Sequence, residues 1–221
     1  MKDTTDWIQR WKDTQIGWHR DQPNSKLIEF IACLQIKQGD TVFVPLCGKS
    51  QDMNYLLSQG FKVIGVELSD LAIEQFFNEN NLLYSVDRAE QFQIYQGENI
   101  TIYCGDYFKL TKQMLNSVSA IYDRAALVAL PVDLREKYAQ HLYSIISNDC
   151  RVLLLTLNYP QSQISGPPFA VDEDEVVSLF SKGFECQQLQ CFDDIKNEPK
   201  FLRAGVDFIQ KATYCLHKTG A

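Results

Sequence analysis

The chain has 221 residues, 45% of them hydrophobic, and a formal net charge of −7 at pH 7, which is enough apolar material for one large core and a single domain over residues 1–221. The excess negative charge disfavours nucleic acid and anionic lipid surfaces as partners, because like charges repel. No apolar run approaches the roughly 20 residues of a membrane span, and residues 1–6 do not resemble a signal peptide, so we expect a cytoplasmic protein with no membrane partner.

Tryptophan is concentrated near the N-terminus, ahead of the first expected strand. Trp7 and Trp11 are four residues apart and share one face of an expected helix, and Trp18 follows. Residues 25–34 are expected to form an amphipathic helix. We describe residues 1–35 as an N-terminal helical cover, because so much aromatic surface must pack on something. It either docks permanently on the sheet or closes over a bound ligand, where a ring stacks on an adenine or a sulfonium cation.

The next segment predicts a strand, a glycine turn, a helix and a second strand. Residues 41–44 form a short apolar strand, Gly48 lies in the turn, and Ser50 is placed to cap the helix that follows. A second apolar run, residues 63–66, ends in the acidic Glu67. This order is typical of a right-handed βαβ unit, which binds nucleoside-containing cofactors at the carboxyl ends of its strands.

The glycine turn does not match two common phosphate-binding motifs. A P-loop requires glycine at the position of Phe43, and a dinucleotide fingerprint requires three glycines where this turn has only Gly48. The pattern favours a ligand that has a ribose but no phosphate to be gripped. Glu67 can accept hydrogen bonds from two ribose hydroxyls, and S-adenosyl-L-methionine fits this description. The alternative is that Gly48 only turns the chain and Glu67 only meets solvent.

After the second strand we expect a helix and then an insertion. Ser69 is placed to cap a helix that ends near Asn80. Residues 81–99 are longer than a tight connection. They predict either a hairpin or a partly ordered insertion beside the sheet.

Two more strands lead to charged residues. The strand over residues 100–104 leads to Asp106, which is placed either to accept from an adenine amino group, with Tyr107 on the ring, or to cap the next short helix. The strand over residues 118–122 leads to Arg124. Because the carboxyl ends of parallel strands meet at one edge of a sheet, these side chains are expected beside the cofactor crevice.

The second half of the chain predicts a helix, a central strand and a loop. Asp133 and Glu136 have the spacing of a capping box at the start of the helix. Residues 151–157 are apolar on both faces, as in a central parallel strand. The remaining expected elements are strands near residues 185–192 and 211–216 and a loop between them that contains Arg203.

The loop over residues 158–169 is rich in proline and aromatic residues. A flat heterocycle is bound by aromatic faces on a rigid support, so Tyr159, Pro168 and Phe169 are predicted to line a substrate pocket. The alternative is that the loop only packs over the edge of the sheet.

The seven cysteines contain no Cys-x-x-Cys pair and no Cys/His cluster with zinc spacing. We interpret them as reduced thiols that mainly contribute to packing, and we expect no metal site. Only Cys47, inside the glycine turn, is expected near a ligand.

Short blocks spread in order over residues 10–169 complete the pattern. They are Arg10-Trp11, Gly17-Trp-His19, Val44-Pro-Leu-Cys-Gly-Lys-Ser50, Asp52-Met53, Gly65-Val-Glu67, Tyr103-Cys-Gly-Asp-Tyr-Phe108, Tyr122-Asp-Arg-Ala-Ala126, Tyr159-Pro-Gln161 and Gly166-Pro-Pro-Phe169. With these blocks the chain resembles the thiopurine S-methyltransferase family of S-adenosylmethionine-dependent enzymes, and most of all its bacterial members.

The resemblance implies an α/β fold with a doubly wound, mostly parallel seven-stranded sheet, Rossmann-like and of the class I methyltransferase type, whose last strand is antiparallel. It also implies S-adenosyl-L-methionine as cofactor and S-adenosyl-L-homocysteine as product. The implied cofactor-binding residues are Trp11, Leu46, Glu67 and Arg124, with Asp106 and Tyr107 along the adenine. Gly48 is added to this set from the strand–turn–helix pattern.

The resemblance further implies S-methylation of thiopurines and other aromatic or heterocyclic thiols, and some bacterial members are credited with selenium and tellurium oxyanions. For such chemistry a protein mainly aligns the reacting atoms and excludes water, and a thiol that enters ionised needs no base. Arg124 and Arg203 are the catalytic candidates because they favour an anionic substrate; the alternative for Arg124 is a structural ion pair with Asp123. We expect a monomer whose partner is a small-molecule thiol.

Two other function classes stay open. The first is a non-catalytic S-adenosylmethionine-binding sensor or partner module that has kept Glu67. Cofactor binding without methyl transfer to any thiol would favour it. The second is an oxidoreductase with the same fold, which the missing glycines disfavour and which quenching of tryptophan fluorescence by NADH would support.

Overall fold

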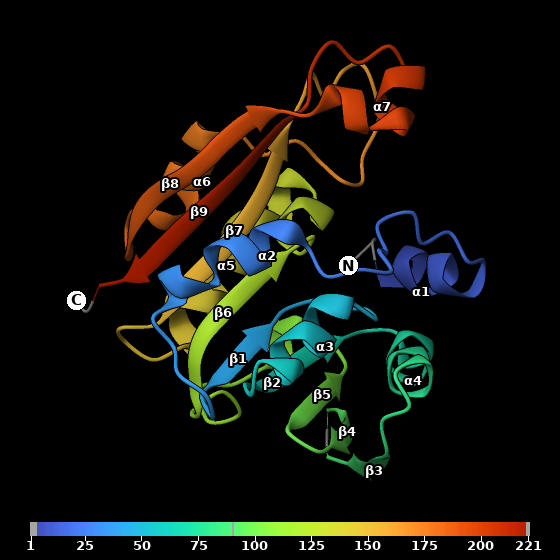
Figure 1. Ribbon diagram of the computed structural model, residues 1–221, viewed down its shortest axis with the longest axis vertical. Helices are drawn as coiled ribbons and strands as arrows, with labels where there is room; N and C mark the ends of the chain where they lie inside the picture. Colours follow the sequence, from blue (N-terminus) through green and yellow to red (C-terminus); the bar gives the residue numbers. More distant parts are fainter. Residues whose placement is uncertain (1–3, 90, 220–221) are drawn as a thin grey trace. The chain divides into compact units, whose positions relative to one another are not determined.

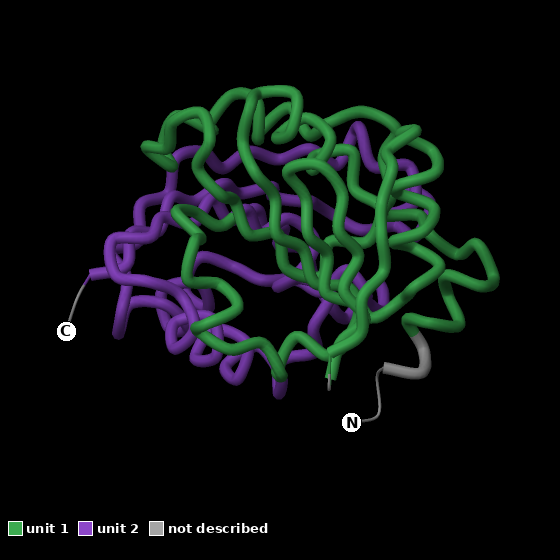
Figure 2. The backbone as a smooth tube through the Cα atoms, turned by 90° about the horizontal axis from the view of Figure 1, so that it is seen from below, with its two compact units in different colours: residues 1–121 green, residues 122–221 purple. Residues whose placement is uncertain are grey.

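The computed structural model describes residues 4–89 and 91–219 and is shown as a ribbon in Figure 1. The chain divides into two compact units, residues 1–121 and residues 122–221, which are coloured green and purple in Figure 2. We refer to them as the N-terminal and C-terminal units. The first three residues of the expected N-terminal cover lie outside the described residues.

The N-terminal unit begins with short helices and continues with strands and helices in turn. Its elements are α1 (Thr4–Lys12), α2 (Ser25–Phe30), the 3₁₀ helix η1 (Ile31–Leu34), β1 (Thr41–Val44), α3 (Gln51–Ser58), β2 (Lys62–Glu67), α4 (Asp70–Glu79), β3 (Tyr84–Arg88), β4 (Gln93–Gly97), β5 (Ile100–Cys104), the 3₁₀ helix η2 (Tyr107–Lys109) and the first part of β6 (Val118–Arg124).

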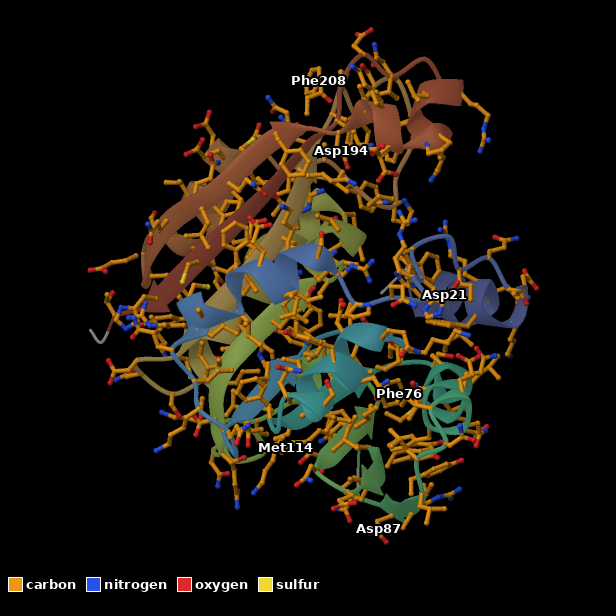
Figure 3. All side chains as sticks on the ribbon, viewed as in Figure 1. Asp21, Phe76, Asp87, Met114, Asp194 and Phe208 are labelled. Atoms are coloured by element: carbon orange, nitrogen blue, oxygen red, sulfur yellow. The ribbon has the colours of Figure 1, made fainter. Side chains whose placement is uncertain are left out.

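The parallel strands of this unit are β5, β2, β1 and β6, in that spatial order. Every residue of β1 is buried, as expected for a strand covered on both faces. Helix α3 packs against β2, and α4 packs against β2 and β5. Phe76, labelled in Figure 3, lies with Phe77 on the buried side of α4. The predicted βαβ unit is therefore present, with its strands parallel and neighbouring.

The insertion after α4 is a hairpin. Strands β3 and β4 pair antiparallel with each other, and β4 pairs antiparallel with β5 along its whole length. The hairpin thus extends the sheet at one end, and Tyr84 on β3 stacks against Phe77 of α4 at 4.6 Å between ring centroids. The structure therefore has the hairpin, which is one of the two forms predicted for residues 81–99.

The C-terminal unit starts in the last residues of β6 and ends with antiparallel strands. Its further elements are the 3₁₀ helix η3 (Leu127–Ala129), α5 (Val132–Ile145), β7 (Arg151–Asn158), α6 (Glu173–Phe180), β8 (Phe184–Asp193), the 3₁₀ helix η4 (Ile195–Asn197), α7 (Pro199–Arg203) and β9 (Gln210–Lys218). Strand β9 lies between β7 and β8 and is antiparallel to both, as predicted for the last strand.

Two expectations differ from the structure in detail. The described residues contain nine strands rather than seven, because the β3–β4 hairpin adds two to the expected set. Asp133 does not cap α5: the helix already begins at Val132, with Pro131 at the N-cap position. Pro131 has the extended backbone of an N-cap residue, with φ −65° and ψ 157°, so the helix begins two residues before the position that the capping-box pattern predicts.

The α/β class itself is confirmed, with a parallel core of strands and helices packed on them. Among the described residues, no helix has both the length and the apolar character needed to cross a membrane.

Candidate functional site

The turn between β1 and α3 contains two residues with a positive φ. Leu46 has φ +46° and Gly48 has φ +52°, so both lie in the left-handed region that disfavours residues with a Cβ. The amide of Cys47, between them, donates to the carbonyl of Val66 on β2 at 3.0 Å. Ser50 then caps α3, as predicted, by accepting from the Asp52 amide. A strained non-glycine residue at a strand end is typical of a functional turn.

Glu67 at the end of β2 binds this turn. Its Oε2 accepts from the Gly48 amide at 2.9 Å, while Oε1 accepts from the amides of Leu68 and Ser69 at 2.9 and 3.0 Å. Its side chain is buried, with 8% exposure. Burial raises the pKa of the carboxyl, and the hydrogen bonds from Ser69, Gly48 and Leu68 oppose that rise.

These three amides determine what Glu67 can still bind. A carboxylate oxygen accepts about two hydrogen bonds, so Oε1 is already saturated and Oε2 retains the capacity for one more donor. That Glu67 accepts hydrogen bonds from ribose hydroxyls stays a prediction, for which Oε2 has the free capacity. The remaining oxygen serves to hold the start of α4, whose N-cap is Ser69.

The tryptophan-rich segment packs on the glycine turn. A Cβ placed on Gly48 would lie 3.0 Å from Cζ2 of Trp11, so the indole ring rests directly on this glycine. Trp11 is 4% exposed, and its ring and that of Trp7 each meet Trp18 edge to face, at 5.8 and 5.1 Å. Within the N-terminal unit, the cover is thus docked on the turn that carries Leu46 and Gly48.

Asp106 follows β5, which runs beside β2. The Gly105 amide donates to the Glu67 carbonyl at 2.8 Å, so the two strand ends are joined directly. Asp106 Oδ1 accepts from the Phe108 amide and caps η2, one of the two uses that the sequence allowed. Tyr107 is buried and meets the Phe108 ring edge to face at 5.3 Å.

Two charged residues of the turn and α3 have structural partners. Lys49 Nζ forms an ion pair with Glu79 of α4 at 2.6 Å, so the lysine of this Gly-Lys-Ser sequence has a structural partner. Asp52 is buried, and its Oδ1 accepts from the Asn24 amide just before α2 at 2.6 Å. These contacts anchor α4 and the cover to the βαβ unit.

In the C-terminal unit, Arg124 is the last residue of β6 and its neighbour Asp123 is fully buried. The carboxylate of Asp123 accepts from the Tyr138 hydroxyl at 2.6 Å and from the Leu127 amide at 3.2 Å. Burial raises the pKa of Asp123 to about 6, although the Tyr138 and backbone hydrogen bonds favour the ionised form. Asp123 thereby fixes the start of η3 at Leu127, three residues after Arg124.

The loop between β7 and α6 is held by its own side chains. The Tyr159 hydroxyl donates to the Pro168 carbonyl at 2.7 Å, and Gln161 bonds Tyr159, the Ile164 carbonyl and the Ala170 amide. Tyr159 is only 3% exposed and packs with Phe201, Val206 and Ile209. Phe169 and Pro168 are partly exposed. Tyr159 therefore supports the loop, while Pro168 and Phe169 present surface.

Arg203 is the exposed last residue of α7. The helix is positioned by Lys211 of β9, whose Nζ binds Asp194 and Glu198 at 2.6 Å each. Asp194 is labelled in Figure 3, near α7. Arg203 thus lies on a helix that is fixed by these two ion pairs. The ion pairs found among the described residues do not include Arg203 itself.

The predicted residues form two groups. Within the N-terminal unit, the structure brings Trp11, Gly48 and Glu67 into contact, with Leu46 in the same turn and Asp106–Tyr107 at the next strand end. The other group, Arg124, Tyr159, Pro168, Phe169 and Arg203, belongs to the C-terminal unit.

The sequence analysis missed Arg135, which binds the loop between β7 and α6 from inside α5. Its partner Glu175 is forty residues away in another helix, so no local pattern could have revealed the pair.

The N-terminal group has the donors and acceptors for an adenosine rather than for a metal. Among the described residues no cluster of three His, Cys, Asp or Glu side chains could hold a metal ion. Glu67 has spare acceptor capacity at the end of β2, Trp11 covers the turn, and Tyr107 provides an aromatic ring at the end of β5. This set is compatible with the adenosine of S-adenosylmethionine, and the cofactor contacts of the individual residues stay predictions.

The whole chain is similar to one family. The family model described as thiopurine S-methyltransferase matches residues 2–219. The thiopurine S-methyltransferase of Nitrosospira multiformis is 42% identical over 210 residues, covering 95% of this chain and 96% of the relative. That of Pseudomonas syringae pv. tomato is 41% identical over the same length, with the same coverage.

Solved structures with lower identity share the fold. A SAM-dependent methyltransferase from Anabaena variabilis has a TM-score of 0.65 and 15% identity, covering 99% of this chain and 96% of that one. The 1,6-didemethyltoxoflavin-N1-methyltransferase of Burkholderia thailandensis, solved with 1,6-didemethyltoxoflavin and S-adenosylhomocysteine, has a TM-score of 0.63 and 16% identity, covering 98% and 87%. The class I methyltransferase fold is confirmed by these neighbours.

Proposed function

This chain belongs to the thiopurine S-methyltransferase family of S-adenosylmethionine-dependent enzymes, and from that premise we propose that it methylates the sulfur of thiopurines and of other aromatic or heterocyclic thiols. The observation that carries the proposal is the Glu67 carboxylate, fixed against the Gly48 turn with acceptor capacity left on Oε2. The family match over residues 2–219 supports this assignment of Glu67.

The reaction needs little acid or base chemistry from the protein. Bound S-adenosylmethionine supplies a methyl group on a positively charged sulfur. A bond forms between the methyl carbon and the substrate sulfur while the bond between the methyl carbon and the sulfonium sulfur breaks. The products are S-adenosylhomocysteine and a thioether. The thiol proton goes to water before the transfer when the substrate enters as a thiolate. The protein contributes alignment and the exclusion of water.

We assign the cofactor contacts to the N-terminal group. Glu67 accepts from a ribose hydroxyl, Leu46 and Gly48 shape the turn that faces the ligand, and Trp11 closes over it. Asp106 and Tyr107 flank the adenine from the end of β5. The rigid hydrogen bonds to Glu67 support this assignment because they leave one direction for a further donor.

We assign the substrate contacts to the C-terminal unit. Arg124 and Arg203 are cationic and favour a thiolate over a neutral thiol. Phe169 and Pro168 offer partly exposed apolar surface for a flat ring, and Tyr159 supports them through the Pro168 carbonyl. The same cations suit selenium and tellurium oxyanions, which we include as candidate substrates.

We also propose that the protein acts as a monomer on small molecules and that it does not bind nucleic acid. The net charge of −7 supports the second point because DNA and RNA are polyanions.

The test is a methyl-transfer assay with methyl-labelled S-adenosylmethionine and a panel of thiopurines, simple aromatic thiols, selenite and tellurite. The proposal predicts labelled thioether from thiopurines and aromatic thiols. Labelled product from selenite or tellurite alone would contradict the thiol assignment. Tight binding of S-adenosylhomocysteine with no transfer to any acceptor would indicate a sensor or partner module instead.

A further inference from the structure

Arg135 is a buried cation in the C-terminal unit that has no place in the chemistry proposed above. It lies in the first half of α5 and is 4% exposed, while Glu136 and Lys137 beside it are exposed. A buried guanidinium is costly unless every face of it is paired. The groups that contact Arg135 therefore indicate what its guanidinium does at this buried position.

The guanidinium joins three segments. Its Nε donates to the Leu130 carbonyl at 2.9 Å, at the end of η3, and its Nη1 donates to the Ala170 carbonyl at 3.0 Å, in the loop that follows β7. Nη1 also binds both carboxylate oxygens of Glu175 in α6 at 2.7 Å. Charge-assisted bonds of this length in a buried site are strong and directional.

The same guanidinium lies over the ring of Phe169, with its Cζ 5.8 Å from the ring centroid. The backbone of Phe169 is fixed too, because its amide donates to the Val128 carbonyl in η3 at 2.7 Å. On the loop itself, Gly166 is folded so closely onto the Phe169 ring that a Cβ there would lie 2.4 Å from Cδ1. Phe169 is thus held by η3, by its own loop and by Arg135.

We infer that Arg135 is a positioning residue that fixes the Phe169 ring, and with it the pocket's preference for flat aromatic thiols. This inference rests on the proposed function, in which Phe169 is part of the substrate wall. Arg135 does not touch the reacting atoms; it acts through the Ala170 carbonyl and the Phe169 ring. Displacing a positioned ring by about 1 Å is enough to slow a reaction by one or two orders of magnitude.

Arginine is required because one planar group must reach several acceptors at once. A lysine at this position keeps the charge and a bond to Glu175, but a single ammonium cannot also span the carbonyls of Leu130 and Ala170 and cover a ring. Arg135→Lys therefore removes the positioning while it leaves the buried charge paired.

The experiment compares Arg135→Lys with Glu175→Gln and with Arg88→Lys, a matched change on the exposed strand β3. For each variant, KM and kcat are measured with a bicyclic thiopurine and with a small aliphatic thiol, and the Kd for S-adenosylhomocysteine is measured by calorimetry. Arg135→Lys is expected to raise the thiopurine KM about tenfold while the cofactor Kd changes less than twofold. The ratio of kcat/KM between the two thiols should fall by a similar factor.

Glu175→Gln retains the bonds from Arg135 to the two carbonyls, so its selectivity ratio should change less than threefold, and Arg88→Lys should not change it. If Arg135→Lys lowers the melting temperature but leaves the KM values and the selectivity ratio unchanged, Arg135 is a purely structural residue and the inference is wrong.

Hydrogen exchange gives a readout that does not depend on turnover. The Phe169 amide, bonded to Val128, should exchange about tenfold faster in Arg135→Lys than in the parent protein, whereas Arg88→Lys should match the parent. Unchanged exchange at Phe169 overturns the positioning role even if the enzyme is active. If the parent protein methylates no thiol, the proposed function fails while the exchange result still decides the positioning.

Discussion

At the scale of single residues, the most consequential finding concerns Glu67. An acid at the end of β2 is expected to bind a ribose, and here it accepts hydrogen bonds from three backbone amides and so holds the turn between β1 and α3. Oε1 secures the start of α4, while Oε2 accepts from the Gly48 amide and keeps capacity for the proposed ribose hydroxyl. Substitutions of Glu67 should separate these tasks.

Glu67→Gln is expected to weaken S-adenosylhomocysteine binding by about 1 to 3 kcal/mol, because a charged acceptor for the ribose is replaced by a neutral one. Glu67→Ala should weaken binding at least as much and also lower the free energy of unfolding, since three amides lose their acceptor. Calorimetric titration and chemical denaturation measure the two effects. Glu74→Gln, on the exposed side of α4, is the charge-matched control. A Kd for Glu67→Gln equal to that of the control would exclude Glu67 from the site.

Asp123 gives the protein a specific dependence of stability on pH. Its pKa is about 6 in the folded chain and 3.8 in its ordinary state, so the folded state holds the proton more tightly. Stability from this group is present below about pH 4 and is lost as pH rises to about 6. The two pKa values differ by about 2, which corresponds to about 3 kcal/mol.

The measurement is chemical denaturation of the parent and of Asp123→Asn between pH 4 and pH 7. The parent should lose stability relative to the variant as pH rises through this window and then level off. Tyr138→Phe removes a hydrogen bond to the carboxylate that favours its ionised form, so it should move the upper end of the window to higher pH. A difference between parent and Asp123→Asn that does not vary with pH would show that Asp123 titrates normally.

At the scale of elements, the helix caps and the glycine turn explain how the N-terminal group is assembled. Ser50 and Ser69 cap α3 and α4, so the two helices begin three residues after Gly48 and Glu67, respectively. The turn between β1 and α3 has no room for a larger residue at position 48, because Trp11 rests on Gly48.

Gly48→Ala tests this packing. The left-handed φ of +52° costs an alanine about 1 kcal/mol, and its Cβ would also press on Trp11 at 3.0 Å. Gly39→Ala is a matched control, since Gly39 has φ +90° but no neighbouring atom within 4 Å. Both variants should lose stability in chemical denaturation. Only Gly48→Ala should also shift the tryptophan emission and weaken cofactor binding; the same emission in both variants would refute the contact.

At the scale of the whole molecule, the ligand should stabilise the fold by mass action. At a concentration of about 100 times its Kd, S-adenosylhomocysteine is expected to raise the free energy of unfolding by about 2.7 kcal/mol, because it binds only the folded chain. NADH at the same concentration should not, since the turn has one glycine where a pyrophosphate needs several bare amides. Thermal unfolding with each ligand is the measurement. Stabilisation by NADH alone would revive the oxidoreductase alternative.

The sequence by itself determined the order of the local elements, whereas the strand predicted over residues 118–122 runs on to Arg124 and that over residues 211–216 to Lys218. The β1–turn–α3–β2 order, the serine caps and the position of Glu67 follow from hydrophobic period and from residues two or three apart, which act on their immediate neighbours. Where a local pattern competed with another, as at Asp133 and Pro131, the capping-box pattern alone misplaced the helix start by two residues.

Only the tertiary structure decided which groups these residues bind. The Gly48 amide meets Glu67 across 19 positions, and Arg135 meets Glu175 across 40. The β3–β4 hairpin likewise became part of the sheet because the edge of β5 was available to pair with it. Contacts between distant residues depend on how helices and strands pack, and packing is set by the whole core rather than by any short stretch of sequence.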